Sequence, residues 1–134
     1  MCLNNWGGID HKVLEFHEYV NLFSGKSGSG KSTVMDAIQV ILYGSFSPSF
    51  LNKAADDAKN RRSVLSYLRG EQKDGSANRK DCDFCSVIAL EIEDTGTHII
   101  TCIGIAFEVR KSDSEIKKFV YFSHSGKMPE SEYL

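Results

Sequence analysis

The 134-residue sequence lacks a long apolar run, a strong excess of charge of either sign and a recognisable export signal. No stretch approaches the roughly 18 apolar residues of a membrane helix, so the sequence predicts no such span. The N-terminus has no basic region followed by an apolar core, which argues against a secretory signal. A formal net charge of -2 argues against a protein that coats nucleic acid by bulk charge alone. We therefore expect a cytoplasmic protein.

Cysteine and histidine are few and give no complete metal site. The pair Cys82-x-x-Cys85 has the spacing of half a zinc site, but a complete site needs four ligands at suitable spacing. The other candidates are scattered and form no second pair: Cys2, Cys102, His98 and His124. Without an export signal, reduced free thiols are favoured over metal binding. His11 and His17 lie on a predicted strand without a carboxylate or cysteine partner, which favours surface positions.

The residues that are present fit one folded domain. Hydrophobic residues make up 41% and charged residues 25%, both near the globular average, and the length suits a single domain. Side chains alternate from residue 11 to residue 23, which predicts extended chain, and residues 20–23 run straight into a glycine-rich loop. After the loop the apolar period becomes helical, with a cap expected at Gly44; the apolar face comprises Val34, Ala37, Ile38, Ile41 and Leu42.

The rest of the chain predicts more helix, a polar tract and then hairpins. Residues 53–69 are expected to hold helix that ends near Gly70. Residues 71–83 predict a surface loop or a disordered tract, with Lys73, Arg79 and Lys80 solvated beside acidic neighbours. An antiparallel meander is expected from strands at 88–93, 99–109 and 119–122, with turns at 94–97 and 111–114. Aromatic residues near the loop are expected to pack in the core and hairpin rather than stack on bases: Trp6, Phe16, Tyr19 and Phe23.

One motif in the sequence predicts a phosphate-binding site. The spacing G-x-x-x-x-G-K-[ST] is met by Gly25, Gly30, Lys31 and Ser32. Glycines let the backbone curl so that successive N–H groups point at phosphate oxygens, and the loop opens a helix N-terminus, which favours negative charge. Lys31 is the catalytic candidate because it brings a compact positive charge to the β- and γ-phosphates, and the Ser32 hydroxyl is a ligand for Mg²⁺.

The motif predicts ATP and Mg²⁺ as the bound cofactors. The alternative is a glycine- and serine-rich turn that precedes a helix by chance, and the strand and helix expected around the loop favour the phosphate loop. The predicted nucleotide-binding residues are Gly25, Lys26, Ser27, Gly28, Ser29, Gly30, Lys31 and Ser32.

The stretch VNLFSGKSGSGKSTVMDAIQVILYG, residues 20–44, resembles the N-terminal head segment of SMC-like ATPases, where the loop is followed by Asp-Ala-Ile and an apolar helix. Trp6-Gly7-Gly8 followed by residues 13–16 resembles the edge hairpin that precedes this loop. The block at 52–55 and RRSVLSYLRG at 61–70 resemble the "sYvRG" region of MukB-like condensins, with the JetC-type component of Wadjet as the nearest match. The resemblance is loose over residues 4–125, specific over 20–70 and only topological in the meander.

The resemblance implies an α/β fold: the N-terminal portion of a P-loop NTPase head of the ABC/SMC type, with an antiparallel β-meander. Such heads sandwich ATP in pairs, carry a long coiled coil and drive DNA loop extrusion; Wadjet systems use this against plasmids, with kleisin-like, accessory and nuclease partners. Thr33 would assist at the phosphates, and Asp36 matches a family position to which no nucleotide contact is assigned. Arg61, Arg62 and Arg69 become candidate contacts to DNA or nucleotide.

The sequence also departs from that family. It contains no L-S-G-G-like signature, and its one acidic candidate, residues 87–91, has a period-2 pattern that fits a solvent-facing strand better than a metal site. We therefore expect residues 1–134 to be a partial head domain, the N-terminal lobe, without the coiled coil and the C-terminal lobe. It would bind nucleotide weakly and hydrolyse ATP only with that lobe and a second head.

Two other functions remain open. A stand-alone small P-loop kinase or nucleotide hydrolase would need a lid with arginines and a buried acidic strand in a parallel sheet, which the predicted hairpins disfavour. A non-catalytic interaction domain that keeps the loop as a relic is disfavoured by the intact Gly30-Lys31-Ser32. We expect a mixed α/β sandwich, an antiparallel layer beside a P-loop core, whose uncovered edges and apolar face promote self-association.

Overall fold

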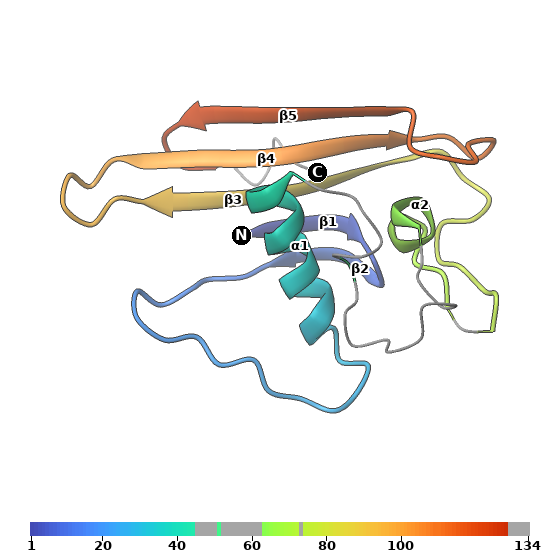
Figure 1. The fold of residues 1–134 in the computed structure, drawn as a ribbon, viewed down its shortest axis with the longest axis horizontal. Helices are drawn as coiled ribbons and strands as arrows, with labels where there is room; N and C mark the ends of the chain where they lie inside the picture. The colour runs from blue at the N-terminus through green and yellow to red at the C-terminus, as the bar shows by residue number, and fades with distance from the viewer. Residues whose placement is uncertain (45–50, 52–62, 73, 129–134) are drawn as a thin grey trace.

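The computed structural model describes residues 1–44, 51, 63–72 and 74–128. The described part holds one antiparallel five-stranded sheet, in the order β2-β1-β3-β4-β5, with α1 crossing one face (Figure 1). Along the chain the elements are β1 (Cys2–Trp6), β2 (Ile9–Val13), α1 (Lys31–Tyr43), α2 (Val64–Leu68), β3 (Phe84–Glu93), β4 (Ile100–Val109) and β5 (Lys118–Ser125).

Tight turns connect the hairpins where the sequence predicts them. The β1–β2 turn passes through Gly7, whose φ of 56° suits glycine. At the β3–β4 turn the Asp94 carboxylate accepts the amides of Gly96 at 2.9 Å and Thr97 at 2.8 Å. This local side-chain bond is typical of aspartate at a turn. The predicted meander of β3, β4 and β5 is therefore confirmed, with β4 paired along its length to both neighbours.

The core lies between the sheet and the two helices. In register, Leu3 pairs with Ile88 and Ile88 pairs with Ile105, so one face of three adjacent strands is apolar. Val34, Ala37 and Val40 of α1 belong to the same cluster, and Ile38 and Ile41 pack against it. The predicted apolar face of the helix is therefore confirmed except at Leu42, which is 56% exposed, and Val40 joins it without having been predicted there. The opposite face carries a smaller cluster of Cys2, Ala89 and Cys102, with Val87, Phe122 and Met128 packed against it.

Gly104 in β4 is a point where the sheet admits no side chain. A Cβ there would lie 2.6 Å from the Ile88 carbonyl oxygen and 2.3 Å from Phe122 Cζ. Because a main-chain atom cannot swing aside, Gly104→Ala is expected to lower the free energy of unfolding by about 2–3 kcal/mol. Urea unfolding measures the change, and Gly8→Ala is the control because a Cβ there meets nothing within 4 Å. Equal stability of the two variants would contradict the packing.

The segment before the loop differs from its prediction. Residues 14–30 contain no strand, and Val20 and Leu22 are 77% and 87% exposed, so the strand predicted at 20–23 is wrong here. The alternation from residue 11 gives a strand only as far as Val13. A strand is stable only when its main chain has a neighbour to pair with, and local sequence does not report that neighbour.

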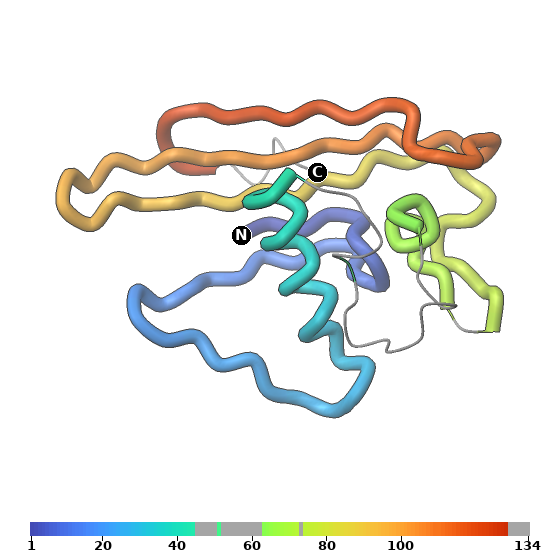
Figure 2. The backbone as a smooth tube through the Cα atoms, in the orientation of Figure 1, coloured from blue at the N-terminus to red at the C-terminus, as the bar shows by residue number. Residues whose placement is uncertain are grey.

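The expected two-layer sandwich is also not what the described residues form. They form one sheet, wholly antiparallel, without a separate P-loop core layer. Figure 2 shows the chain from β2 sweeping out and back to α1 without entering the sheet. The helix expected over 53–69 is seen as α2, while its first part, 53–62, lies outside the described residues. Residues 71–83 form a loop, as predicted, except for residue 73, which is not described.

Candidate nucleotide-binding site

The glycine-rich loop adopts backbone angles that only glycine accepts readily. Gly25, Gly28 and Gly30 have φ values of 154°, 83° and 90°. At Gly25 a Cβ would also lie 2.6 Å from the Ser29 Oγ. The amide of Ser29 donates to the Lys26 carbonyl at 3.2 Å and closes the turn. The spacing of glycines in the motif is therefore needed for the curl itself.

The Lys31 ammonium lies within this curl. Its Nζ donates to the carbonyls of Gly25 at 2.7 Å and Lys26 at 2.9 Å, and to the Ser29 Oγ at 3.2 Å. All three acceptors are neutral, and Lys31 forms no ion pair with any described carboxylate. The ammonium charge is thus uncompensated at the loop, which suits it to an incoming anion.

The N-terminus of α1 completes the anion-binding geometry. The helix begins at Lys31, its N-cap is Gly30 without a side-chain bond, and no acidic residue occupies its first turn. The first helical bond runs from the Val34 amide to the Gly30 carbonyl at 3.1 Å. The N–H groups of Lys31, Ser32 and Thr33 cannot find partners within the helix, so they and the macrodipole favour a bound anion.

Packing holds this helix end against the sheet. Val34, Ala37 and Val40 are buried on α1, and Gly44 ends the helix in the left-handed conformation, as predicted. Ser32 stays exposed at the loop, where its hydroxyl can reach a metal ion. Asp36 is only 5% exposed, so it belongs to the packed side of the helix rather than to the loop. The described loop residues therefore fit a polyphosphate with Mg²⁺.

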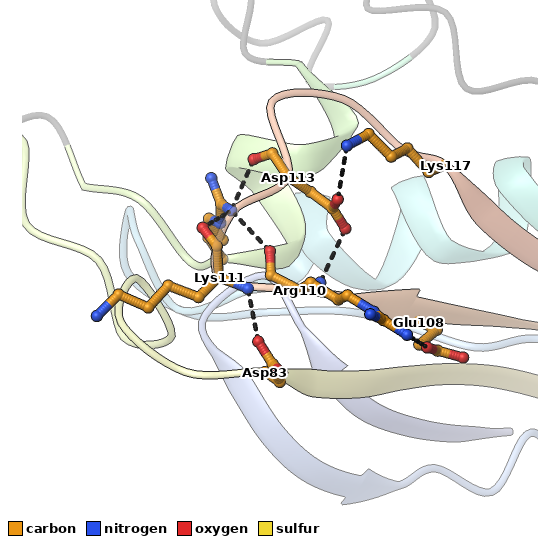
Figure 3. Close-up of polar contacts among 7 residues, drawn as sticks. Asp83, Glu108, Arg110, Lys111, Asp113 and Lys117 are labelled. Atoms are coloured by element: carbon orange, nitrogen blue, oxygen red, sulfur yellow. Dashed lines mark hydrogen bonds and ion pairs between the residues drawn. The ribbon is translucent and has the colours of Figure 1, made fainter.

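Arg69, a candidate DNA or nucleotide contact, is engaged in the fold. Its Nη2 donates to the carbonyls of Arg110 at 3.2 Å, Lys111 at 3.1 Å and Asp113 at 2.9 Å, all in the β4–β5 turn. In the same turn the Asp113 carboxylate accepts the Arg110 amide and pairs with Lys117 at 3.1 Å (Figure 3). Those two groups lower the pKa of Asp113. Arg61 and Arg62 lie outside the described residues.

The cations that line this turn are paired with carboxylates. Glu108 pairs with Lys118 and, at 3.5 Å, with Arg110. A hollow of about 350 Å³ lies here, lined by Glu108, Arg110, Ser112, Asp113, Lys117 and Lys118. Because each of the three cations in this lining pairs with Glu108 or Asp113, the hollow offers a phosphate less uncompensated charge than the glycine-rich loop does.

Other candidates lie apart from the loop. Glu91, the acidic candidate, is in β3 and accepts the Met128 amide at 2.9 Å on the face opposite α1, so the strand interpretation is confirmed. Cys82 and Cys85 are exposed free thiols, and no cluster of His, Cys, Asp or Glu among the described residues could hold a metal ion. His11 and His17 are exposed as predicted.

The predicted packing of the aromatic residues near the loop is confirmed only in part. Trp6 is fully buried, and Phe16 and Phe23 pack edge to face at 6.2 Å. Tyr19 is 87% exposed, so its predicted packing is wrong, since no described element covers the segment that carries it. Sequence reasoning also missed that the Trp6 indole reaches the first turn of α1, because an indole donor to a main-chain carbonyl leaves no sequence pattern.

Comparison with known proteins agrees with this site. Residues 1–58 match the family described as the P-loop containing region of AAA domain. Over 72 residues the chain is 33% identical to the SbcC component of the nuclease SbcCD from Staphylococcus haemolyticus (strain JCSC1435), a match covering 51% of this chain. The match covers 6% of that relative. No helix in the described residues is long and apolar enough to cross a membrane. The matches support a P-loop ATP-binding region of the SMC/SbcC type and do not single out MukB-like or Wadjet-type condensins.

Proposed function

We propose that residues 1–134 are the N-terminal, ATP-binding part of an SMC-like ATPase head that uses Mg²⁺. The observation that carries the proposal is the Lys31 ammonium, held by neutral loop acceptors beside the N-terminus of α1. A site with uncompensated positive charge and amides without helical partners is suited to the triphosphate.

Each loop residue has a binding role that its chemistry determines. The β- and γ-phosphates would take the place of the carbonyls as partners of Lys31, while main-chain amides of residues 26–28 and 30–33 would bind the remaining phosphate oxygens. The Ser32 hydroxyl would hold Mg²⁺, which would neutralise part of the negative charge of the triphosphate. Thr33 borders the same amides and assists at the phosphates.

Hydrolysis needs groups that the described residues do not bring to the loop. Glu91 lies on the far face of the sheet, so we assign the acidic motif and the signature motif to a C-terminal lobe and a second head. The exposed side chains of Val20 and Leu22 support this, because no described strand lies beside that segment and a strand from the C-terminal lobe would pair with it.

The finer assignment follows the resemblance over residues 20–70. We assign the complete protein to MukB-like or Wadjet-type condensins, which act on DNA by loop extrusion or anti-plasmid defence with kleisin-like subunits. It would work in the cytoplasm, associated with the nucleoid. Arg61 and Arg62 are proposed contacts to DNA or nucleotide, and Arg69 is the weaker candidate because main-chain carbonyls engage its guanidinium.

The stand-alone kinase or nucleotide hydrolase is the alternative. It would need a parallel sheet with a buried acidic strand beside the loop and a lid bearing arginines. All pairs in the described sheet are antiparallel, and both Arg69 and Arg79 bond to main-chain carbonyls of the fold. These observations favour the partial head.

The test compares binding with turnover. The pure chain is expected to bind ATP with Mg²⁺ by calorimetry and to release no phosphate over many hours. Adding the C-terminal lobe in trans should produce ATP hydrolysis that DNA stimulates. Steady phosphate release by the pure chain that depends on Lys31 would favour the stand-alone enzyme, and failure of the lobes to associate would remove the split-head proposal.

A further inference from the structure

The single tryptophan of the sequence contacts the helix that follows the phosphate loop. Trp6 is fully buried at the end of β1, and its Nε1 donates to the Thr33 carbonyl at 2.8 Å. Its ring lies 4.7 Å, centroid to centroid, from that of Tyr67 in α2, with the planes inclined by 44°. The indole of Trp6 therefore joins its own hairpin, β1–β2, to both α1 and α2.

Gly7, the residue after Trp6, lets the hairpin pack closely against the same two helices. A Cβ at Gly7 would lie 3.0 Å from Thr33 Cγ2 and 3.0 Å from Tyr67 Cε1. Only glycine lets the hairpin turn approach both helices this closely, and its φ of 56° also suits glycine. The first turn of α1 is thus held by a hydrogen bond and by close packing on one side.

That first turn carries the groups that receive the phosphates. Lys31 and Ser32 immediately precede Thr33, and their amides and side chains move with its carbonyl as one rigid helical turn. A loop held in its binding orientation before the ligand arrives loses less conformational freedom on binding. Rotation of the turn about the helix axis would misdirect the amides and the Lys31 ammonium together.

We propose that Trp6 is a positioning residue of the nucleotide site, acting through its indole N–H on the Thr33 carbonyl. This inference rests on the proposed ATP binding. Trp6 itself is buried and has no exposed surface with which to touch nucleotide, so its effect passes through the first turn of α1.

An isosteric replacement tests the hydrogen bond without changing the packing. Because Trp6 is the only tryptophan, a tryptophan auxotroph supplied with 3-benzothienylalanine replaces that one N–H by sulfur. The Kd for Mg-ATP is expected to rise about 10-fold, since one hydrogen bond that orients the turn is lost. Ile105→Val, a core truncation away from the loop, is the control: it should lower the unfolding temperature and leave Kd unchanged.

A spectroscopic measurement on the wild-type chain tests the role of Trp6 even if the analogue-bearing chain fails to fold. The wild-type chain gives one indole N–H signal in a proton–nitrogen correlation spectrum, and this signal should shift with Mg-ATP but not in Lys31→Ala. An unmoved signal in a chain that binds ATP, or an unchanged Kd in the folded analogue-bearing chain, would overturn the role of Trp6. Absence of ATP binding by the wild-type chain would instead overturn the proposed function on which it rests.

Discussion

Lys31→Ala is expected to weaken binding of Mg-ATP by about 100-fold, or about 2.8 kcal/mol. The ammonium now bonds to the Gly25 and Lys26 carbonyls, and with ATP present it would make charge-assisted bonds to phosphate oxygens. Hydrogen bonds to charged groups contribute about 1.5–3 kcal/mol each, which sets the size of the loss. Titration calorimetry of both chains with Mg-ATP measures it.

The same substitution should leave the fold nearly unchanged. The acceptors of Lys31 are loop groups at an exposed site, where water can replace the ammonium, so the free energy of unfolding should change by less than about 0.5 kcal/mol. Lys12→Ala is the charge-matched control, because Lys12 is an exposed lysine of β2 outside the loop. If Lys12→Ala weakened binding as much as Lys31→Ala, bulk charge rather than the loop would account for the affinity.

The phosphate loop could be predicted from sequence because its causes are local. Gly25, Gly28 and Gly30 stand where the curl needs positive φ, and the apolar period after Lys31 predicts the helix and most of its buried face. The β3–β4 hairpin was predictable for the same reason, since Asp94 caps its turn through neighbouring amides. Each of these elements depends on residues within a few positions of one another.

The arrangement of the sheet could not be predicted in this way. β1 lies between β2 and β3, so Leu3 pairs with Ile88 across 85 positions of sequence (88 − 3). The segment at 20–23 has strand-forming residues but no described strand beside it, and propensity does not say which neighbour a strand will find. Pairing between residues far apart in the sequence decides both the order of the strands and whether residues 20–23 form one.

Arg79 is the clearest failure of pattern reading. It stands in a polar tract among acidic residues, which predicts solvation, yet it is only 6% exposed, so that prediction is wrong. Its Nε donates to the Leu68 carbonyl at 3.0 Å, its Nη2 donates to the Gly7 carbonyl, and its Nη1 pairs with Asp10 at 2.7 Å. Two of these partners are main-chain oxygens, which a search for side-chain partners does not detect.

Arg79 joins the loop after α2 to the β1–β2 hairpin. Its guanidinium also lies 5.6 Å from the centre of the Phe84 ring, a cation–π contact. Burial lowers the pKa of Arg79, while the Asp10 carboxylate opposes the shift. The group stays charged at neutral pH, since arginine starts from a very high pKa.

Arg79→Met is expected to lower the free energy of unfolding by about 3 kcal/mol, because two buried carbonyls lose their donor at about 1–3 kcal/mol each. The Asp10 pair should add little to this, since the Asp10 side chain is 81% exposed and solvent screens it. Asp10→Asn should therefore cost less than about 1 kcal/mol. Urea unfolding followed by circular dichroism measures all of these changes.

Lys80→Met is the matched control, because Lys80 is the exposed neighbour of Arg79 and loses the same charge. It should change stability by less than about 0.5 kcal/mol. A loss as large in Lys80→Met as in Arg79→Met would mean that net charge, not the two carbonyl bonds, sets stability. A loss in Asp10→Asn equal to that in Arg79→Met would assign the effect to the ion pair. We expect Arg79→Met to be much less stable than Lys80→Met and Asp10→Asn. Only Arg79→Met leaves the Gly7 and Leu68 carbonyls buried without their donor.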